Sequence, residues 1–452
     1  MKNKIIVLGI AAIIVFANLL FTNSGCSSPT TTMDATANGI SNKFAVLPMD
    51  IVAQSQKVAD TFSWQSFIAM NWPANITTCG PDTSNGSTIL TGKGPVVWET
   101  YLSSDQVFVA SPDAPSPWCS NNNAVTSLTH LPQKVQDLAR KTGVYRFVHR
   151  ISKSPHALDQ AVGGPLVDQN GRFARYEVRM NYDEYNFITK NNLWNIAGQN
   201  KYAADSTTIT MPAGPSAYGA NGAMEFKAAW KVLGKGDDTN KFYKIKAIVY
   251  NDDSGDPSPG ENPVTLGLVG LHIAHKTALQ RNWVWSTFEQ VDNLTKSFYN
   301  ANCDTCTPNL PIPGSNYKEL NPDGSPINKP TQVKRVNAVE DPFADSINLY
   351  FQSLLKGSVW ANYKLVSTQW LFAETMTPSF LANSVQETYV QGPHPASYGG
   401  FHLNIDQPYY TDSLYQPFAK GISSSCMGCH YVATFPAAPA RTDFSFIYGE
   451  AH

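Results

Sequence analysis

The chain has 452 residues, of which 42% are hydrophobic and 15% charged, and 33 Lys and Arg against 35 Asp and Glu give a formal net charge of -2. This apolar content is enough to bury a full core in one large domain or two ordinary ones, which excludes a wholly disordered chain. The near-neutral charge argues against a protein that binds the phosphate backbone of nucleic acid, so we expect no nucleic-acid partner.

The N-terminus has the pattern of an export signal. Lys2 and Lys4 precede an apolar run over residues 5–21, which is the order of a secretory signal peptide. The following residues 27–45 are mostly small and polar, which predicts a flexible tether. We therefore expect the folded part of the chain to lie outside the cytoplasm.

The end of this signal, residues 1–26, resembles the lipobox of bacterial lipoproteins. Small residues stand directly before Cys26, although Asn23 occupies the position where the pattern usually has Leu. The resemblance implies that Cys26 is lipidated and holds the protein on a membrane at the periplasmic or cell-surface side. Because Ser27 is not the Asp of an inner-membrane retention signal, the outer membrane is expected. Two alternatives stay open, an ordinary Cys26 after standard cleavage and an apolar run that remains as a transmembrane anchor.

The body of the chain, residues 46–340, has a mixed pattern. Apolar spacing predicts helices over 47–72 and 131–141. Runs rich in β-branched and aromatic residues predict seven strands, over 96–101, 145–151, 175–180, 225–232, 242–250, 264–275 and 283–288. Long polar segments separate these runs, so the expected fold class is α+β, with a sheet-rich body and loop insertions.

Helical patterns return in the C-terminal region, residues 341–452. They cover 341–355, 379–390 and 414–431. We therefore expect a C-terminal helical segment attached to the sheet-rich body.

Four of the seven Cys lie in polar loops of the body. Cys303 and Cys306 form a C-x-x-C without a following His, which in an oxidising compartment favours a loop disulfide. Cys79 and Cys119 are candidates for a second disulfide, although the sequence does not fix the connectivity.

The strongest motif is Cys426-Met427-Gly428-Cys429-His430, a C-x-x-C-H. On a helical turn, two Cys three residues apart reach the two vinyl groups of one porphyrin edge, and the adjacent His reaches the iron. The spacing therefore predicts one covalent haem c, with Cys426 and Cys429 as attachment residues and His430 as the proximal iron ligand. The weaker alternatives are a plain disulfide and a four-Cys zinc site completed by Cys303 and Cys306.

At these three residues the chain resembles c-type cytochromes. Two further stretches, 225–230 (Glu-Phe-Lys-Ala-Ala-Trp) and 270–277 (Gly-Leu-His-Ile-Ala-His-Lys-Thr), are similar to bacterial proteins described only as cytochrome c family proteins. The resemblance implies a haem cofactor and a redox partner protein, but no particular reaction.

The position of the motif constrains the sixth iron ligand. Only 22 residues follow His430 and none is Met, so a protein ligand has to come from upstream, unlike in a class I cytochrome. His272 and His275 are the first candidates, because they lie in an apolar run. On a strand, their spacing places them on opposite faces, so only one can face a given haem. The alternative for each is an ordinary core or edge His. Weaker candidates are Met376, His394 and His402.

Other side chains could shape a haem site. Four Trp have apolar neighbours and are expected in a haem pocket or, more simply, in the core: Trp283, Trp285, Trp360 and Trp370. Glu289 and Asp292 are candidate acids for proton delivery or, alternatively, exposed charges at a strand end.

These observations lead to three hypotheses. The first is an exported monohaem cytochrome that transfers electrons. The second is a haem enzyme, of peroxidase or oxygenase type, with an open iron position. A haem enzyme accounts for the length of the chain. Roughly a hundred residues suffice to enclose one haem, and the sheet-rich body would then supply a substrate pocket. The third is a lipoprotein binding module in which the haem is sensory or structural. No catalytic residue is assigned by the sequence.

Overall fold

The computed structural model describes fourteen stretches of the chain. They are residues 40–53, 55–84, 86–110, 114–120, 131–149, 165–250, 262–303, 305–310, 319–321, 323–335, 341–370, 381–390, 426–430 and 433–452. The predicted signal, Cys26 and most of the tether lie outside these residues. Within them, no helix is both long enough and apolar enough to cross a membrane.

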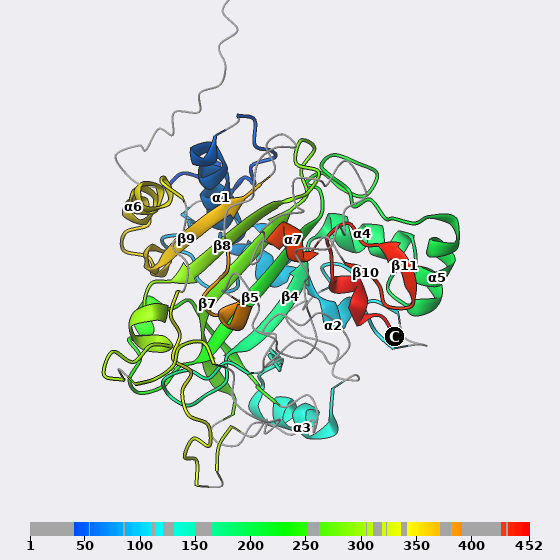
Figure 1. Ribbon diagram of the computed structural model, residues 1–452. Helices are drawn as coiled ribbons and strands as arrows, with labels where there is room; N and C mark the ends of the chain where they lie inside the picture. The colour runs from blue at the N-terminus through cyan, green and yellow to red at the C-terminus, as the bar shows by residue number, and fades with distance from the viewer. Residues whose placement is uncertain are drawn as a thin grey trace, which may run out of the picture.

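A seven-stranded antiparallel sheet forms the centre of the molecule (Figure 1). Six strands follow the order β3-β4-β5-β7-β8-β9, and β6 pairs with one end of β7. The strands are β3 (Leu102–Ser103), β4 (Arg175–Met180), β5 (Met224–Val232), β6 (Lys244–Ala247), β7 (Val264–His275), β8 (Val284–Gln290) and β9 (Tyr363–Gln369). The central strands are buried on both faces, which matches their continuous apolar character rather than a strict alternation.

One face of the sheet, the α1 face, packs against α1 (Gln56–Met70) and α6 (Ala344–Leu354). An aromatic cluster fills this layer: the Phe67 ring lies 4.2 Å from that of Phe288, and the Trp64 ring stacks on Phe351 at 5.2 Å. Burial of such rings is the main apolar contribution to the fold.

The opposite face, the α7 face, is the one turned toward the viewer in Figure 1, with α7 (Cys426–His430) in front of the strands. Strand register aligns its side chains in rows. The first, here the Trp285 row, consists of Met180, Glu225, Ala274, Trp285 and Gln369, each the Cα partner of the next. The second, the His272 row, consists of Val178, Lys227, His272 and Thr287. Since two residues along a strand span about 7 Å, the rows are close neighbours.

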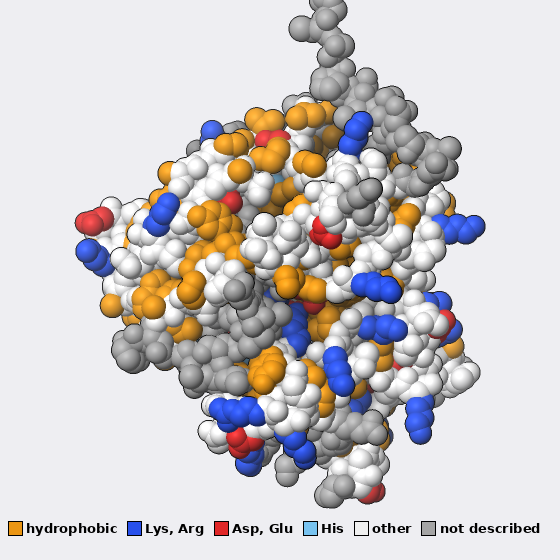
Figure 2. All heavy atoms as spheres, turned by 180° about the vertical axis from the view of Figure 1, so that it is seen from behind, with side chains coloured by type: hydrophobic (Ala, Val, Ile, Leu, Met, Phe, Trp, Pro, Cys, Tyr) orange, Lys and Arg blue, Asp and Glu red, His pale blue; other side chains and the backbone are white. Residues whose placement is uncertain are grey.

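The other elements are short. The helices are α2 (Ser104–Val107), α3 (Gln133–Thr142), α4 (Tyr182–Lys190) and α5 (Ile196–Asp205), and the small strands are β1 (Ala74–Asn75), β2 (Gly80–Pro81), β10 (Thr434–Phe435) and β11 (Ala438–Arg441). The 3-10 helices are η1 (Asn42–Ala45), η2 (Val97–Thr100), η4 (Thr239–Lys241), η6 (Val359–Asn362), η7 (Thr388–Val390) and η9 (Ile447–Glu450), and η5 (Asn293–Ser297) is a π-helix. Figure 2 shows the side opposite to that of Figure 1, where hydrophobic side chains gather mostly over the upper half, and Lys and Arg side chains mostly over the lower half.

The expectation of an α+β fold with a sheet-rich body is confirmed. Strands were predicted correctly at β4, β5, β7 and β8, and helices at α1, α3 and α6. The strand expected over 96–101 is wrong, because this segment forms η2. The strand expected over 145–151 is reduced, in its described part, to a single bridge between Phe147 and Ile248. The helix expected over 379–390 is a turn followed by η7 in its described part, and most of 414–431 lies outside the described residues.

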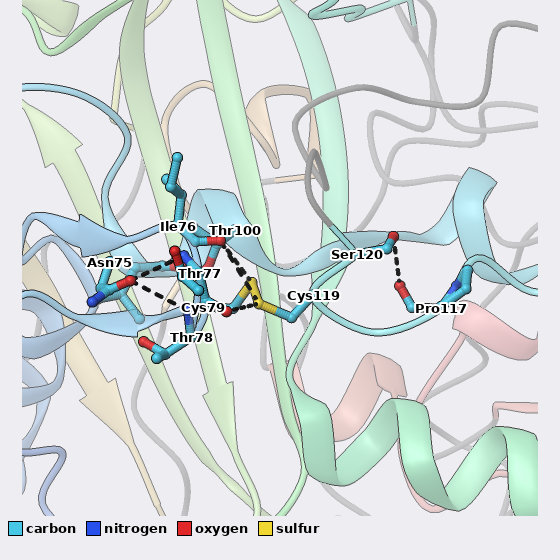
Figure 3. The surroundings of a disulfide bond; sticks show 10 residues. Asn75, Ile76, Thr77, Thr78, Cys79, Thr100, Pro117, Cys119 and Ser120 are labelled. Carbon is cyan, nitrogen blue, oxygen red and sulfur yellow. Dashed lines mark hydrogen bonds between the residues drawn. A yellow bond between two sulfur atoms is a disulfide. The ribbon is translucent and has the colours of Figure 1, made fainter.

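Two disulfides are present, Cys79–Cys119 and Cys303–Cys306, as the sequence suggested. Cys79–Cys119, shown in Figure 3, joins residues 40 positions apart, and Cys79 lies in a tight turn where its N–H donates to Asn75 O at 2.8 Å. In the chain-entropy account, closing a loop of this length stabilises the fold by about 4 kcal/mol, against about 2 kcal/mol for a separation of a few residues. Because Cys303 and Cys306 are bonded to each other, they do not supply thiolates to a four-Cys zinc site.

Candidate functional site

The short helix α7 is anchored on the Trp285 row. The N–H of Met427 donates to Gln369 Oε1 at 2.8 Å. The Met427 side chain is fully buried in an apolar cluster with Trp285, Leu381 and Phe435. A five-residue helix has little stability of its own, so these tertiary contacts hold it. The Cys426 side chain is partly buried beside the same cluster, and the Cys429 side chain lies outside what the structure describes.

His430, at the end of α7, has a defined orientation. Its ring centroid lies 4.6 Å from that of Trp285 and 5.0 Å from that of Phe446. Nδ1 lies 2.8 Å from the carbonyl oxygen of Phe444. Because a carbonyl only accepts, Nδ1 carries the proton, and in the neutral ring Nε2 then has the lone pair. This is the tautomer in which a His coordinates a metal through Nε2.

The Phe444 carbonyl is itself held by an unusual turn. Asp443 and Phe444 have φ angles of 51° and 71°, in the left-handed region that is unfavourable for residues other than Gly. The Asp443 carboxylate accepts from Lys276 Nζ at 2.9 Å and from the Met211 N–H at 2.7 Å. Lys276 directly follows β7, so the end of a central strand fixes the turn that orients His430.

His272 lies on the α7 face, but both of its ring nitrogens have partners. Nε2 lies 3.1 Å from each carboxylate oxygen of Glu387, and Nδ1 is hydrogen-bonded to the Thr287 hydroxyl. Burial by itself raises the pKa of Glu387, yet the charge and hydrogen bonds of His272, with the charge of Lys227, bring this pKa down to about 2. Glu387 is therefore ionised and accepts from Nε2–H, so in this arrangement His272 offers no nitrogen lone pair to an iron.

His275 lies on the α1 face instead. Its ring stacks on Phe62 of α1 at 5.7 Å, and Nε2 donates to the carbonyl of Asn221 at 2.7 Å. Burial lowers the pKa of His275 to about 4, so the ring is neutral near pH 7. The expected separation of the two His onto opposite faces is thus present, and the structure does not bring His275 and His430 together.

The remaining candidates are distributed as follows. Met376, His394 and His402 lie outside the described residues. Trp360 and Trp370 pack in the α1 layer, and Trp283 lies in the cluster of Trp285.

The two candidate acids are held in ion pairs. Glu289 Oε1 lies 2.7 Å from Arg335 Nη2, and the Asp292 carboxylate lies 3.0 Å from Lys241 Nζ. Burial raises the pKa of Glu289, but Arg335, Lys364 and the Ser384 N–H outweigh this effect, so the net shift is downward. An ionised, paired Glu289 does not fit a proton donor.

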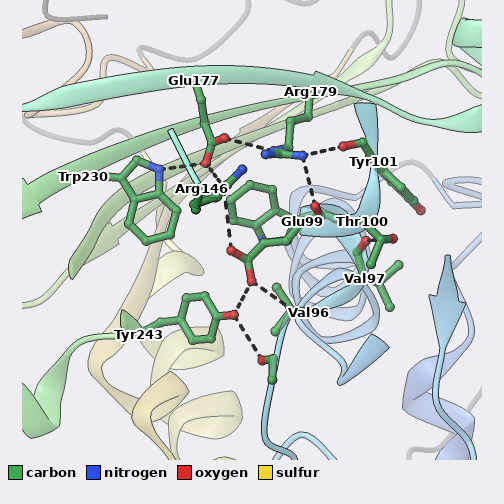
Figure 4. Close-up of polar contacts among 12 residues, drawn as sticks. Val96, Val97, Glu99, Thr100, Tyr101, Arg146, Glu177, Arg179, Trp230 and Tyr243 are labelled. Atoms are coloured by element: carbon green, nitrogen blue, oxygen red, sulfur yellow. Dashed lines mark hydrogen bonds and ion pairs between the residues drawn. The ribbon is translucent and has the colours of Figure 1, made fainter. Parts of the chain in front are cut away.

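A second polar cluster lies on the α1 face, shown in Figure 4. Glu177 accepts from Trp230 Nε1 at 2.9 Å, from Arg146 at 2.6 Å and from Arg179 at 2.9 Å. Arg179 also donates to the carbonyls of Glu99 and Tyr101, which ties the segment around η2 to β4. These mutual hydrogen bonds and ion pairs are typical of a structural network, although the buried Arg146 Nε has no hydrogen-bond partner among the described residues. Beside it, at the outer edge of β4, is a cavity of about 300 Å³ lined in part by Asp105, His149 and Tyr250.

The sequence indicates His430 as a candidate ligand but gives no sign of the groups that orient it. The Phe444 carbonyl is a backbone atom, and Lys276 and Asp443 are 167 residues apart. Among the described residues there is no group of three or more His, Cys, Asp or Glu arranged to hold a metal ion. Comparison with models of protein families, with curated proteins and with solved structures found no match for this chain.

Proposed function

We propose that this chain carries one haem c, bound through Cys426 and Cys429 with His430 as an axial iron ligand, and that it transfers electrons. In this proposal α7 is the haem-attachment segment, at the C-terminal end of the sheet-rich body. The observation that carries the proposal is the C-x-x-C-H motif together with the His430 tautomer, in which Nε2 has the lone pair.

The described residues fit one side of such a site. The donor set matches haem c, since a c-type haem takes two thioether links and a neutral imidazole. Trp285 and Phe446 restrict the rotation of the imidazole, which is partly buried. The Phe444 carbonyl keeps the proton on Nδ1 and increases the basicity of Nε2. When bound, the haem supplies one-electron redox chemistry.

The proposal includes the cellular setting. The signal and Cys26 favour an exported, lipid-anchored protein. Ser27, the residue after Cys26, favours the outer membrane. A redox partner protein would exchange electrons with it there. No part of this setting requires a nucleic-acid partner.

A second candidate is a haem enzyme of peroxidase or oxygenase type with an open iron position. The observation that favours it is the polar group of Lys227, His272, Thr287 and Glu387 on the α7 face, one row from Trp285. Such groups can bind a polar substrate or move a proton. His272, with both nitrogens engaged, suits this role better than iron ligation.

The test of haem attachment is expression of the full chain in a host with c-type haem maturation. Wild-type protein should carry covalent haem that survives denaturing electrophoresis, and Cys426→Ser/Cys429→Ser should carry none. Cys303→Ser/Cys306→Ser is the matched control and should keep haem at the wild-type level. Haem at the wild-type level in the Cys426→Ser/Cys429→Ser protein would contradict the proposal.

Absorption spectra with and without carbon monoxide then separate the two candidates. Low-spin bands that carbon monoxide does not change indicate two protein ligands and an electron carrier. A high-spin spectrum that shifts with carbon monoxide indicates an open iron position and a haem enzyme.

A further inference from the structure

The two disulfides among the described residues differ in exposure. Cys79 is buried and Cys119 is partly buried, whereas Cys303 is partly buried and Cys306 is exposed. They also differ in what they join, since their sequence separations are 40 and 3. The stabilisation expected from a crosslink grows with the loop it closes, so Cys303–Cys306 contributes about half as much as Cys79–Cys119 through this effect.

The segment that carries Cys303 and Cys306 is also fixed without their bond. Before the pair, the Asn300 N–H donates to Gln332 Oε1 at 3.0 Å, and Gln332 Nε2 donates to the Asn300 carbonyl at 3.0 Å. After the pair, the Asn309 N–H donates to the Gln332 carbonyl at 2.8 Å. Both flanks of the segment are therefore held by Gln332, and the disulfide is not needed to close it.

A disulfide with one exposed Cys and a smaller contribution to stability is of the kind that reacts with external thiols. We propose that Cys303–Cys306 is a redox-active disulfide that accepts electrons from a protein dithiol, and that Cys306 is the sulfur attacked. The class of partner is a thioredoxin-fold protein with a solvent-accessible Cys pair. The proposal does not depend on haem binding.

The exchange proceeds in two balanced displacements. A partner thiolate attacks Cys306 Sγ, the Cys303–Cys306 bond breaks, and the Cys303 sulfur leaves with the electron pair and takes a proton from water. The second partner thiol, deprotonated, then attacks the partner sulfur of the mixed disulfide, and Cys306 leaves as a thiolate that is protonated in turn. Two electrons and two protons reach Cys303 and Cys306, and the partner dithiol becomes a disulfide.

The difference in solvent exposure between the two Cys indicates which sulfur is attacked first. The nucleophile needs an approach in line with the sulfur–sulfur bond, and the exposed Cys306 allows this more readily than the partly buried Cys303.

The first test compares the two disulfides within one native protein. Exported wild-type protein is treated with dithiothreitol, sampled over time, alkylated and mapped by peptide mass spectrometry. Cys303 and Cys306 should become alkylated at least tenfold faster than Cys79 and Cys119. A difference of less than tenfold would overturn the proposal.

The second test traps the attack. A thioredoxin-fold protein that has lost its resolving Cys is mixed with the oxidised wild-type protein, and the mixed disulfide should map to Cys306. Formation on Cys303, or on neither Cys, would overturn the proposal.

The double variant Cys303→Ser/Cys306→Ser is the control for both tests. It should form no such adduct, and its thermal midpoint should stay within about 3 °C of wild type, because the Gln332 hydrogen bonds remain. A larger loss of thermal stability would show a structural disulfide instead.

Discussion

His430 is restricted by two rings and one hydrogen bond, and each has a separate effect. The Phe444 carbonyl selects the tautomer, and Trp285 and Phe446 select the ring orientation. In the proposed haem site, an imidazole fixed in this way would lose less freedom on binding an iron, which would increase its affinity.

The contribution of Trp285 can be measured against another buried Trp. Trp285→Leu should lower the free energy of unfolding by about 2–4 kcal/mol and should also change the visible spectrum of the proposed haem-bound form. Trp370, 3% exposed on the α1 face, is the control: Trp370→Leu should cost a similar amount and leave the spectrum unchanged. Equal spectral changes in both variants would contradict a local role for Trp285.

His275 gives a prediction for pH dependence. Its pKa is about 4 in the folded protein, because it is buried, and about 6.5 in an unfolded chain. As the pH falls from 6.5 toward 4, the unfolded state binds a proton that the folded state does not, so this group lowers stability by about 3 kcal/mol over that range. His275→Gln should lose this slope, as measured by urea unfolding at pH 7.5 and 4.5. His452→Gln, at the exposed C-terminus, should keep it, and an unchanged slope in His275→Gln would contradict the assignment.

At the scale of elements, the turn at Asp443 and Phe444 joins β7 to α7. Two consecutive residues other than Gly in the left-handed region cost on the order of 1–3 kcal/mol each, so a compensating interaction is required. The ion pair between Lys276 and Asp443 provides it, since the side chains are only 6% and 10% exposed.

Removing Lys276 should therefore be costly. Lys276→Met should lower the free energy of unfolding by about 3–5 kcal/mol, because it leaves a buried carboxylate without its cation. Lys241→Met removes the partner of Asp292 from a pair in which Lys241 is 33% exposed, and should cost about 0–1 kcal/mol. Chemical denaturation of both variants measures the difference, and similar losses would contradict the assigned role of Lys276.

The elements that the sequence predicted are those whose signal is local. β4 and β7 have the bounds expected from their β-branched and aromatic residues. η2 was missed because the Glu99 side chain accepts from the Val96 N–H and closes a helical turn in a segment with strand composition. β9 was missed because its Lys, Ser, Thr and Gln resemble a loop, and only pairing with β8 makes it a strand.

The contrast between local sequence signals and tertiary contacts also applies to the candidate site around His430. Cys426, Cys429 and His430 could be proposed from the sequence because the motif is contiguous. The His272 partner Glu387 is 115 residues away, and the Phe444 carbonyl has no side-chain signal, so neither could be found without the fold.

For the whole molecule, the C-terminal region shares its core with the body. β9 pairs with β8 through six Cα partners, and α6 covers the same face as α1. Phe351, Trp360 and Tyr363 all belong to the apolar cluster that contains Trp64 and Phe67. Removal of the C-terminal region would expose this cluster and leave β8, which carries Val284, Trp285 and Phe288, as an unpaired edge strand, which promotes aggregation.

A chain ending at residue 340 should therefore not fold on its own. We expect it to show neither a cooperative thermal transition by circular dichroism nor the near-ultraviolet signal of packed aromatic rings, because the Trp64 layer has lost its partners. The control is a chain of residues 40–452, which lacks only the residues before Ile40 and should keep both. A cooperative transition in the shorter chain would instead show an independent body and a separable C-terminal region. In that case the contacts between the residues before 340 and those after it would be contacts between two docked domains. Lys276→Met and Trp285→Leu would then weaken the docking of these domains without lowering the stability of either one.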